Sequence, residues 1–186
     1  YEGKHASMAN IESVRDRVIT VNGFSKGYAM TGWRVGYLAA SREIAAACDK
    51  MQSQVTSGTC SIAQKAAAAA LKGGNASSLE MVEAYRRRRS LVLDLMQEIP
   101  GFKTYVPSGA FYIFPEVSAY FGKSYEGKVI NSALDLSMFI LMDAHVAVVS
   151  GEAFGAPQCI RFSYATSDEK LTEALRRIKN SLAKLQ

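Results

Sequence analysis

The sequence contains few of the residues on which disulfide frameworks and metal sites depend. Its 186 residues include three cysteines and two histidines, and no cysteines are spaced as Cys-x-x-Cys. This scarcity argues against a disulfide framework or a zinc site and fits a reducing compartment, so the cytoplasm is the expected location. No apolar run is long enough to span a membrane, and no charged-then-apolar targeting pattern opens the chain. We therefore expect neither a bound metal ion nor a membrane partner.

The excess of positive charge is small, with 22 lysines and arginines against 17 acidic residues. The most basic run is Arg86–Arg89. Four successive positions cover about 300° of a helix, so at least one of these arginines must face inward. Arg89 falls on the apolar stripe and is expected to snorkel or to pair with an acid. The run could bind phosphate or nucleic acid, but a solvated helix face is the favoured interpretation, and no nucleic-acid partner is expected.

The spacing of apolar residues alternates between strand-like and helix-like, which predicts an α/β fold. The expected strands span residues 17–21, 35–40, 102–106, 110–114, 146–149 and 160–164. The expected helices span residues 41–55, 62–71, 77–100 and 132–144, with a last helix from 166 onward. Residues 120–128 are polar and contain glycine, which predicts a loop.

The order of these elements predicts three regions. Residues 1–76 are expected to be the remnant of a larger sheet domain, 77–100 a long interdomain helix, and 101–186 a smaller sheet-and-helix domain. The chain opens with Tyr-Glu-Gly-Lys-His and has no initiator methionine. We expect it to be an excerpt from a longer protein.

Three sequence signals predict where helices begin and end. Ser77 with Glu80, and Thr166 with Glu169, have the spacing of a capping box, so each pair is expected to start a helix. His145 stands where glycine usually ends a helix, and a left-handed cap residue is expected there.

Apolar stripes at helical spacing predict which faces of the helices are buried. The expected inward residues are Ile44, Cys48, Met51 and Val55 in the first helix; Val82, Tyr85, Arg89, Val92, Met96 and Ile99 in the third; Met138, Leu141 and Met142 in the fourth; and Leu171, Leu175, Ile178, Leu182 and Leu185 in the last.

Residues 22–37, NGFSKGYAMTGWRVGY, place Lys26 and Arg34 in a glycine-punctuated loop between two expected strands. Open α/β sheets bind their ligands at such strand ends. A lysine there can form a Schiff base with a carbonyl, and an arginine can grip a phosphate with two hydrogen bonds. Together they indicate pyridoxal phosphate, an aldehyde that carries a phosphate. The spacing alone also fits a surface lysine and a structural arginine.

Arg161 lies inside an expected strand between Ile160 and Phe162, where an unpaired guanidinium is unfavourable. It must pair with a carboxylate of the protein or with that of a ligand, and the residues alone favour neither. A competing motif fails: residues 122–124 end like a phosphate-binding loop, but Val117 stands where the first glycine must be.

Four segments carry a resemblance to a known family: SKGYAMTGWRVGY (25–37), PSGAFYIFPEVS (107–118), VAVVSGEAFG (146–155) and CIRFSYATSDEKLTEALRRI (159–178). In this order they resemble the lysine region and C-terminal part of fold-type I pyridoxal-phosphate aminotransferases of class I/II, of the bacterial aspartate aminotransferase type. The resemblance covers nearly the whole chain. It implies the C-terminal part of the large cofactor-binding domain followed by the small α/β domain.

The resemblance implies a role for four residues. Lys26 resembles the Schiff-base lysine, which also moves a proton between the substrate Cα and the cofactor. Arg34 resembles the arginine that clamps the cofactor phosphate, and Ser25 is expected to assist it. Arg161 resembles the arginine that binds the α-carboxylate of the substrate.

The chain also departs from the family pattern. Gly23 stands where some members have a hydroxyl residue that contacts the cofactor, and Ser150 replaces a frequent proline, which we expect to loosen its loop. The family's aspartate for the pyridine nitrogen, its tyrosine for the phenolic oxygen and its glycine-rich phosphate loop lie upstream of the lysine region. We therefore expect the C-terminal half of an aminotransferase. This half is expected to be inactive by itself and can occur without bound cofactor.

For the full-length protein, the resemblance implies a homodimer that moves an amino group from an amino acid, aspartate or a similar one, to 2-oxoglutarate. One alternative is another fold-type I enzyme, such as a C–S lyase or a cyclopropane-carboxylate synthase. The alternative from another class is a non-catalytic basic fragment whose arginine run contacts nucleic acid. The sequence does not determine the side-chain specificity.

Overall fold

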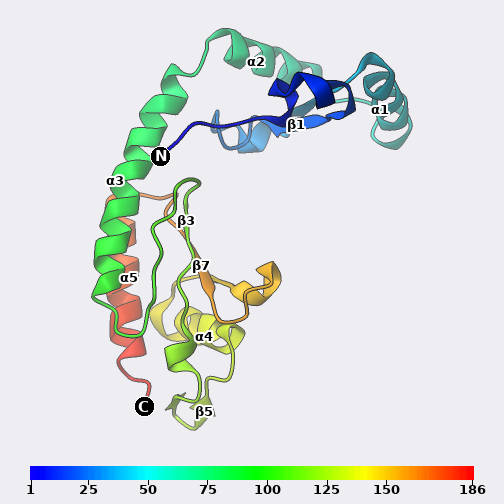
Figure 1. Ribbon diagram of the computed structural model, residues 1–186. Coiled ribbons are helices and arrows are strands. Elements are labelled where there is room, and N and C mark those ends of the chain that lie inside the picture. Colours follow the sequence, from blue (N-terminus) through cyan, green and yellow to red (C-terminus); the bar gives the residue numbers. More distant parts are fainter. The chain divides into compact units, whose positions relative to one another are not determined.

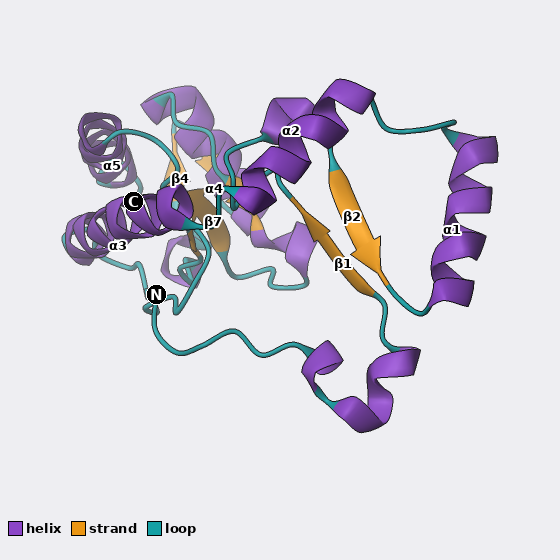
Figure 2. Ribbon diagram, turned by 90° about the horizontal axis from the view of Figure 1, so that it is seen from above, coloured by secondary structure: helices purple, strands orange, loops and turns teal.

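The chain divides into two compact units in the computed structural model, which describes residues 1–186. The N-terminal unit is Gly3–Met81, and the C-terminal unit is Tyr1–Glu2 together with Val82–Gln186. Helix α3 (Ala76–Gln97) contains the boundary between the two. Helices account for 51% of the residues and strands for 12% (Figure 2), so the expected α/β class is confirmed.

The N-terminal unit consists of an antiparallel strand pair and two helices (Figure 1). Its elements are the 3-10 helices Met8–Asn10, Glu12–Arg17 and Thr31–Trp33, strands β1 (Thr20–Gly23) and β2 (Gly36–Ala39), helices α1 (Arg42–Val55) and α2 (Ser61–Lys72), and the first turns of α3. Both helices and β2 lie where the sequence predicts them. The strand predicted from Arg17 begins three residues later, because Arg17 closes a 3-10 helix.

Strands β1 and β2 approach each other most closely beside the loop that joins them. Gly23 lies opposite Gly36 in the antiparallel register. A Cβ added to Gly36 would lie 2.9 Å from the carbonyl oxygen of Asn22. Only glycine allows this approach, so Gly36 fixes the place where the chain leaves the strand pair and enters the loop.

The hydrophobic core of the N-terminal unit is small. Its buried members are Phe24, Met30, Val35, Ala63 and Ala67. Helix α1 has no buried residue, and two members of its predicted apolar stripe, Met51 and Val55, are exposed. The helix was thus predicted correctly, but the burial of its stripe was not.

The C-terminal unit contains a three-stranded antiparallel sheet in the order β3-β7-β6. The strands are β3 (Tyr112–Ile113), β6 (Val149–Ser150) and β7 (Ile160–Ser163). Strand β7 lies where predicted and β3 is shorter than expected, whereas β6 begins only at the last residue of the strand predicted at 146–149. The predicted loop 120–128 includes all of β4 (Ser124–Tyr125) and the first residue of β5 (Lys128–Val129), which form a small hairpin.

The strand predicted at residues 102–106 is wrong. Only Lys103 forms a ladder contact, as an isolated bridge to Glu116, while Tyr105 and Val106 are exposed. An apolar run of this length forms a strand only if a neighbouring strand satisfies its backbone, and here pairing stops after one residue.

Helices α3 and α5 (Asp168–Leu182) lie side by side in both views (Figures 1 and 2), and α4 (Ala133–Phe139) continues into the π-helix Ile140–Ala144. Nineteen buried residues from these helices, the sheet and the connecting loops form one core. Each large apolar side chain contributes about 1.5–3 kcal/mol on full burial, so this unit has much the larger hydrophobic stabilisation. The predicted stripe of α5 is buried throughout, from Leu171 to Leu185.

Both predicted capping boxes are displaced. Helix α3 begins at Ala76, so Ser77 lies inside its first turn. Helix α5 has Ser167, not Thr166, at its N-cap, where the hydroxyl accepts a hydrogen bond from the amide of Lys170. The predicted cap at His145 is confirmed: it ends the π-helix in the left-handed conformation with φ 55°.

The inward face predicted for α4 is also wrong. Met138, Leu141 and Met142 are exposed, whereas Leu136 and Ile140 are fully buried. Both faces of this helix are apolar, so periodicity alone does not identify the buried one. No helix in the chain combines the length and apolarity needed to cross a membrane.

Candidate functional site

The loop between β1 and β2 is anchored by Phe24, whose side chain is buried. The Phe24 amide donates to the carbonyl of Val35 (3.3 Å), and its own carbonyl accepts from the amides of Tyr28 (3.2 Å) and Met30 (3.4 Å). The ring of Tyr28 lies 5.4 Å from that of Phe24. A buried aromatic residue at the start of the loop therefore holds the residues that follow it at the surface.

Ser25 and Lys26 follow this anchor directly. The side chain of Lys26 is exposed and that of Ser25 is half-buried. The carbonyl of Lys26 accepts from the amide of Ala29 (3.2 Å), and the Ser78 hydroxyl donates to the carbonyl of Gly27. The backbone on both sides of Lys26 is thus fixed, which limits the positions its amine can reach.

Arg34 lies at the other end of the same loop. Its backbone is left-handed, with φ 51° and ψ 49°, and its Nη1 donates to the carbonyl of Thr31 at 2.9 Å. No carboxylate lies within ion-pair distance of Arg34. A left-handed arginine is uncommon, and here the guanidinium has a backbone carbonyl but no carboxylate as its partner.

A cavity of about 870 Å³ opens beside Arg34. Its lining also includes Trp33, Thr59 and Cys60, and Cys60 occupies the N-cap position of the twelve-residue helix α2. The amides of Ala63 and Ile62 lower the pKa of the Cys60 thiol, although its side chain forms no capping hydrogen bond. Because these amides and the guanidinium of Arg34 all favour negative charge, the cavity is suited to an anion.

Arg161 lies on β7, the central strand of the C-terminal sheet. Its neighbours Ile160 and Phe162 are buried in the core, so alternation places Arg161 on the opposite face. Its Cζ lies 4.5 Å from the ring centroid of Tyr112 and 4.5 Å from that of Phe154. No carboxylate of the chain pairs with it. The sequence left open whether Arg161 pairs with a carboxylate of the protein or of a ligand, and the protein supplies none.

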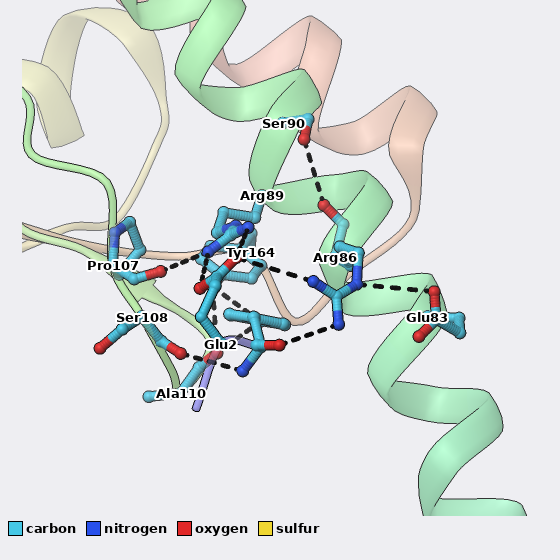
Figure 3. Close-up of polar contacts among 10 residues, drawn as sticks. Glu2, Glu83, Arg86, Arg89, Ser90, Pro107, Ser108, Ala110 and Tyr164 are labelled. Carbon is cyan, nitrogen blue, oxygen red and sulfur yellow. Dashed lines mark hydrogen bonds and ion pairs between the residues drawn. The ribbon is translucent and has the colours of Figure 1, made fainter. Parts of the chain in front are cut away.

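The arginine run on α3 has a different environment (Figure 3). Arg89 is 7% exposed and makes two hydrogen bonds to Glu2, of 2.7 and 3.0 Å, and one of 2.6 Å to the carbonyl of Pro107. The hydrogen bonds from Arg89 to Glu2 lower the pKa of the Glu2 carboxyl. The prediction that Arg89 faces inward and pairs with an acid is confirmed.

The other three arginines of the run also contact carboxylates. Arg87 and Arg88 both bind Asp168, at 3.1 and 3.2 Å, and hydrogen bonding, to Arg87 above all, lowers the pKa of that carboxyl. Arg86 lies 3.6 Å from Glu2 and 3.6 Å from Glu83. All four cations of the run are therefore partnered within the chain.

The predicted site residues fall into two groups. Ser25, Lys26 and Arg34 share one loop of the N-terminal unit, where Arg34 lines the cavity and the other two do not. Arg161 belongs to the C-terminal unit. Sequence reasoning did not single out Tyr112 or Phe154, although both lie in motifs that carry the family resemblance. It also missed Cys60, which the cluster of small polar residues before α2 could have indicated as a cap.

Residues 2–178 match the family described as aminotransferase class I and II. The chain belongs to this family. It is 48% identical over 187 residues to an aspartate aminotransferase of Pinus pinaster, covering 98% of this chain and 38% of the relative. A bifunctional aspartate aminotransferase and glutamate/aspartate-prephenate aminotransferase of Petunia hybrida is 46% identical, with 98% and 39% covered.

The fold agrees with a solved structure of the same family. The crystal structure of an aspartate aminotransferase from Rhizobium meliloti superposes with a TM-score of 0.93 at 43% identity, covering 100% of this chain and 47% of that one. The chain thus spans about two fifths to one half of the length of these relatives, and the resemblance inferred from the four sequence segments is confirmed.

Proposed function

We propose that the protein containing this chain is a pyridoxal-phosphate-dependent aminotransferase that moves the amino group of an amino acid, aspartate or a similar one, to 2-oxoglutarate. The relatives are named for this activity. The observation that carries the proposal is Arg161, a strand arginine without a carboxylate partner in a fold that pairs its other half-buried arginines. An amino acid and a 2-oxo acid each have the carboxylate that would fill this position.

The donors of the β1–β2 loop fit a phosphate-bearing aldehyde. Between Gly23 and Gly36 the loop contains a lysine, an arginine and several hydroxyls but no carboxylate. Arg34 and the N-terminus of α2 line the same cavity, which suits a phosphate, with Ser25 as a further donor on the loop. When bound, pyridoxal phosphate supplies a carbon that accepts the amino group and a ring that delocalises electrons from the substrate Cα.

Lys26 is proposed to be the catalytic residue. Its exposed amine can attack a carbonyl carbon as a nucleophile and, once released by the incoming amino group, can remove the proton from the substrate Cα. The anchored backbone on both sides of Lys26 supports this role, because one amine must reach first the carbonyl carbon and then the proton on the substrate Cα.

Arg161 is proposed to orient the substrate. A guanidinium forms two parallel hydrogen bonds with a carboxylate, which fixes both the position and the direction of the bound acid. An oriented α-carboxylate restrains the bonds at the neighbouring Cα, so that the proton to be removed can be presented to a base.

The wider assignment follows from the family. We assign residues 1–76 to the large cofactor-binding domain, 77–100 to an interdomain helix and 101–186 to the small domain. The two compact units, which meet inside α3, support this division. For the full-length protein we propose a homodimer in the cytoplasm.

The proposal is tested on the full-length protein with added pyridoxal phosphate. We expect the visible absorbance band that the cofactor gains on binding a lysine amine, and its loss in Lys26→Ala. Lys50→Ala, which removes another exposed lysine, is the matched control and should retain the band. A wild-type protein without the band, or a Lys26→Ala variant that keeps it, would disprove the cofactor role.

The reaction itself is tested by glutamate formation from 2-oxoglutarate across a panel of amino donors. Glutamate from aspartate or a similar donor is the expected result. If no donor yields glutamate while the absorbance band is present, the protein belongs with the lyases or synthases of the same fold type. The alternative of a basic nucleic-acid-binding fragment is disfavoured, because the four arginines of α3 already contact carboxylates.

A further inference from the structure

Two aromatic side chains flank the guanidinium of Arg161. The ring centroids of Tyr112 and Phe154 each lie 4.5 Å from its Cζ. The two rings do not form a contact pair with each other, although each of them contacts another ring. Two rings from separate segments thus contact the same cation. A cation–π contact attracts the positive charge and supplies no carboxylate or carbonyl acceptor for the N–H groups.

The N–H donors of the guanidinium are consequently available. The side chain of Arg161 donates no hydrogen bond to the chain and has no ion pair. A planar guanidinium directs its five N–H donors outward in its own plane. A carboxylate that approaches in this plane can bind with both oxygens.

The two rings come from separate segments, and each segment is fixed by its own contacts. Tyr112 lies on β3, where it is opposite Ser163 of β7, two residues beyond Arg161. Strands β3 and β7 are adjacent in the sheet (Figure 1). A side chain at this diagonal position on the same face can reach across to its neighbour.

Phe154 ends the 3-10 helix Gly151–Phe154, which follows β6. The hydroxyl of Ser150 accepts a hydrogen bond from the amide of Glu152 at 3.3 Å and so caps this turn. A Cβ on Gly151 would overlap the carbonyl oxygens of Ala156 and Cys159, so the turn closes tightly onto the following chain.

We propose that Tyr112 and Phe154 are positioning residues for substrate binding, which hold the guanidinium of Arg161 through cation–π contacts and leave its N–H donors for the carboxylate of an amino acid or 2-oxo acid. This inference rests on the role proposed above for Arg161. Without the rings the guanidinium can rotate about its side-chain bonds, so part of the binding free energy is spent on fixing it. The rings act through Arg161 and need no contact with the reacting atoms.

The test measures 2-oxoglutarate binding and steady-state kinetics of the full-length protein. Phe154→Leu and Tyr112→Leu are each expected to weaken binding roughly tenfold, the size of one lost cation–π contact at a partly desolvated site. KM should rise by a similar factor, while kcat changes much less. Phe154→Tyr and Tyr112→Phe keep an aromatic face and should bind within about twofold of the wild type.

A double-mutant cycle separates positioning from a general effect on the fold. In an Arg161→Met background, adding Phe154→Leu should cause no further loss of 2-oxoglutarate binding, because the ring has no guanidinium left to hold. A further loss of the same tenfold size would overturn the proposal. The side-chain Nε–H resonance of Arg161 provides a second readout, since loss of either ring should shift it by removing a ring current.

The outcomes also distinguish this inference from the proposed function. If Arg161→Met binds 2-oxoglutarate as tightly as the wild type, the carboxylate role itself is wrong. If Arg161→Met abolishes binding but both leucine variants bind normally, Arg161 binds the substrate without help from the rings, and only the positioning role fails.

Discussion

Arg89 and Arg161 are two arginines of the same unit in opposite electrostatic situations. Both stack on aromatic rings, Arg89 at 4.4 Å from the Tyr1 centroid and Arg161 at 4.5 Å from two centroids. Arg89 also binds Glu2 and a backbone carbonyl, whereas Arg161 has neither partner. The cost of removing a cation from water is offset within the chain for Arg89 and only partly offset for Arg161.

The difference teaches how to separate structural from functional arginines. A partnered arginine such as Arg89 completes its own hydrogen bonds, so a ligand would have to displace Glu2 to bind it. An arginine held only by cation–π contacts is positioned while its N–H donors stay available. The pairing state, more than burial or sequence context, indicates which arginine binds a ligand.

The largest expected effect comes from removing the unpartnered arginine. Arg161→Met in the full-length protein should lower kcat/KM by about a hundredfold or more, because the substrate carboxylate loses both charge-assisted hydrogen bonds. Its unfolding free energy should change by less than about 1 kcal/mol, because the loss of two cation–π contacts is offset by the removal of a half-buried cation that has no carboxylate partner. Steady-state assays and urea denaturation measure the two quantities. If Arg161→Met lost enough stability to account for its loss of activity, Arg161 would be a structural arginine like Arg89.

The reverse pattern is expected for the partnered arginine. Arg89→Met should destabilise the protein by about 2 kcal/mol, less than a fully buried ion pair would cost, because Glu2 is 56% exposed and stays hydrated. Activity per folded molecule should remain near that of the wild type. Urea denaturation followed by assays at saturating substrate tests this. An Arg89→Met protein with wild-type stability would mean that its hydrogen bonds contribute nothing to the fold.

A smaller effect is expected from acid. The pKa of Glu2 is lowered by its hydrogen bond to Arg89, so the folded state binds fewer protons than the unfolded state once the pH falls below about 4.5. The stabilisation is complete above the ordinary glutamate pKa and is lost as the pH falls through the lowered value. Measured from pH 6 to pH 2.5, stability should fall less steeply in Arg89→Met than in the wild type. Arg161→Met should keep the wild-type slope; a reduced slope there would reveal a hidden carboxylate partner.

The smallest effect is expected at the exposed part of the arginine run. Arg87→Gln removes one of two cations on Asp168, and Arg88 can keep the remaining contact. Exposed ion pairs contribute little, so the denaturation midpoint should not change measurably.

The wild-type chain should also show no salt-sensitive binding to random DNA, because these arginines are already partnered. Strong salt-dependent binding that Arg87→Gln weakens would restore the nucleic-acid interpretation.

Much of the fold could be predicted because local patterns determine it. Strand β7 and helix α5 lie where their apolar spacing indicates, and His145 ends its helix in the left-handed conformation expected from its position. The inward position of Arg89 followed from helix geometry alone. In each case the residues that set the structure are neighbours in the sequence.

The failures concern relations between distant segments. Residues 102–106 have the composition of a strand, but pairing depends on a neighbour that contacts only Lys103. Met138 and Ile140 are equally apolar, so the choice of buried face depends on what packs against the helix. The rings beside Arg161 could not be predicted for the same reason: Tyr112 lies 49 residues before it, and Phe154 reaches it only because the turn after β6 folds back.

Gly151 therefore has an influence that its position in the chain does not suggest. It has no side chain and lies ten residues from Arg161, yet its amide and carbonyl bond to Cys159 and Ala156, and any larger residue would overlap the carbonyl oxygens of both and open the turn that contains Phe154. A substitution at Gly151 is therefore expected to weaken substrate binding in a protein that still folds. In a survey of natural or laboratory variants, Gly151 should tolerate change as poorly as the arginine itself.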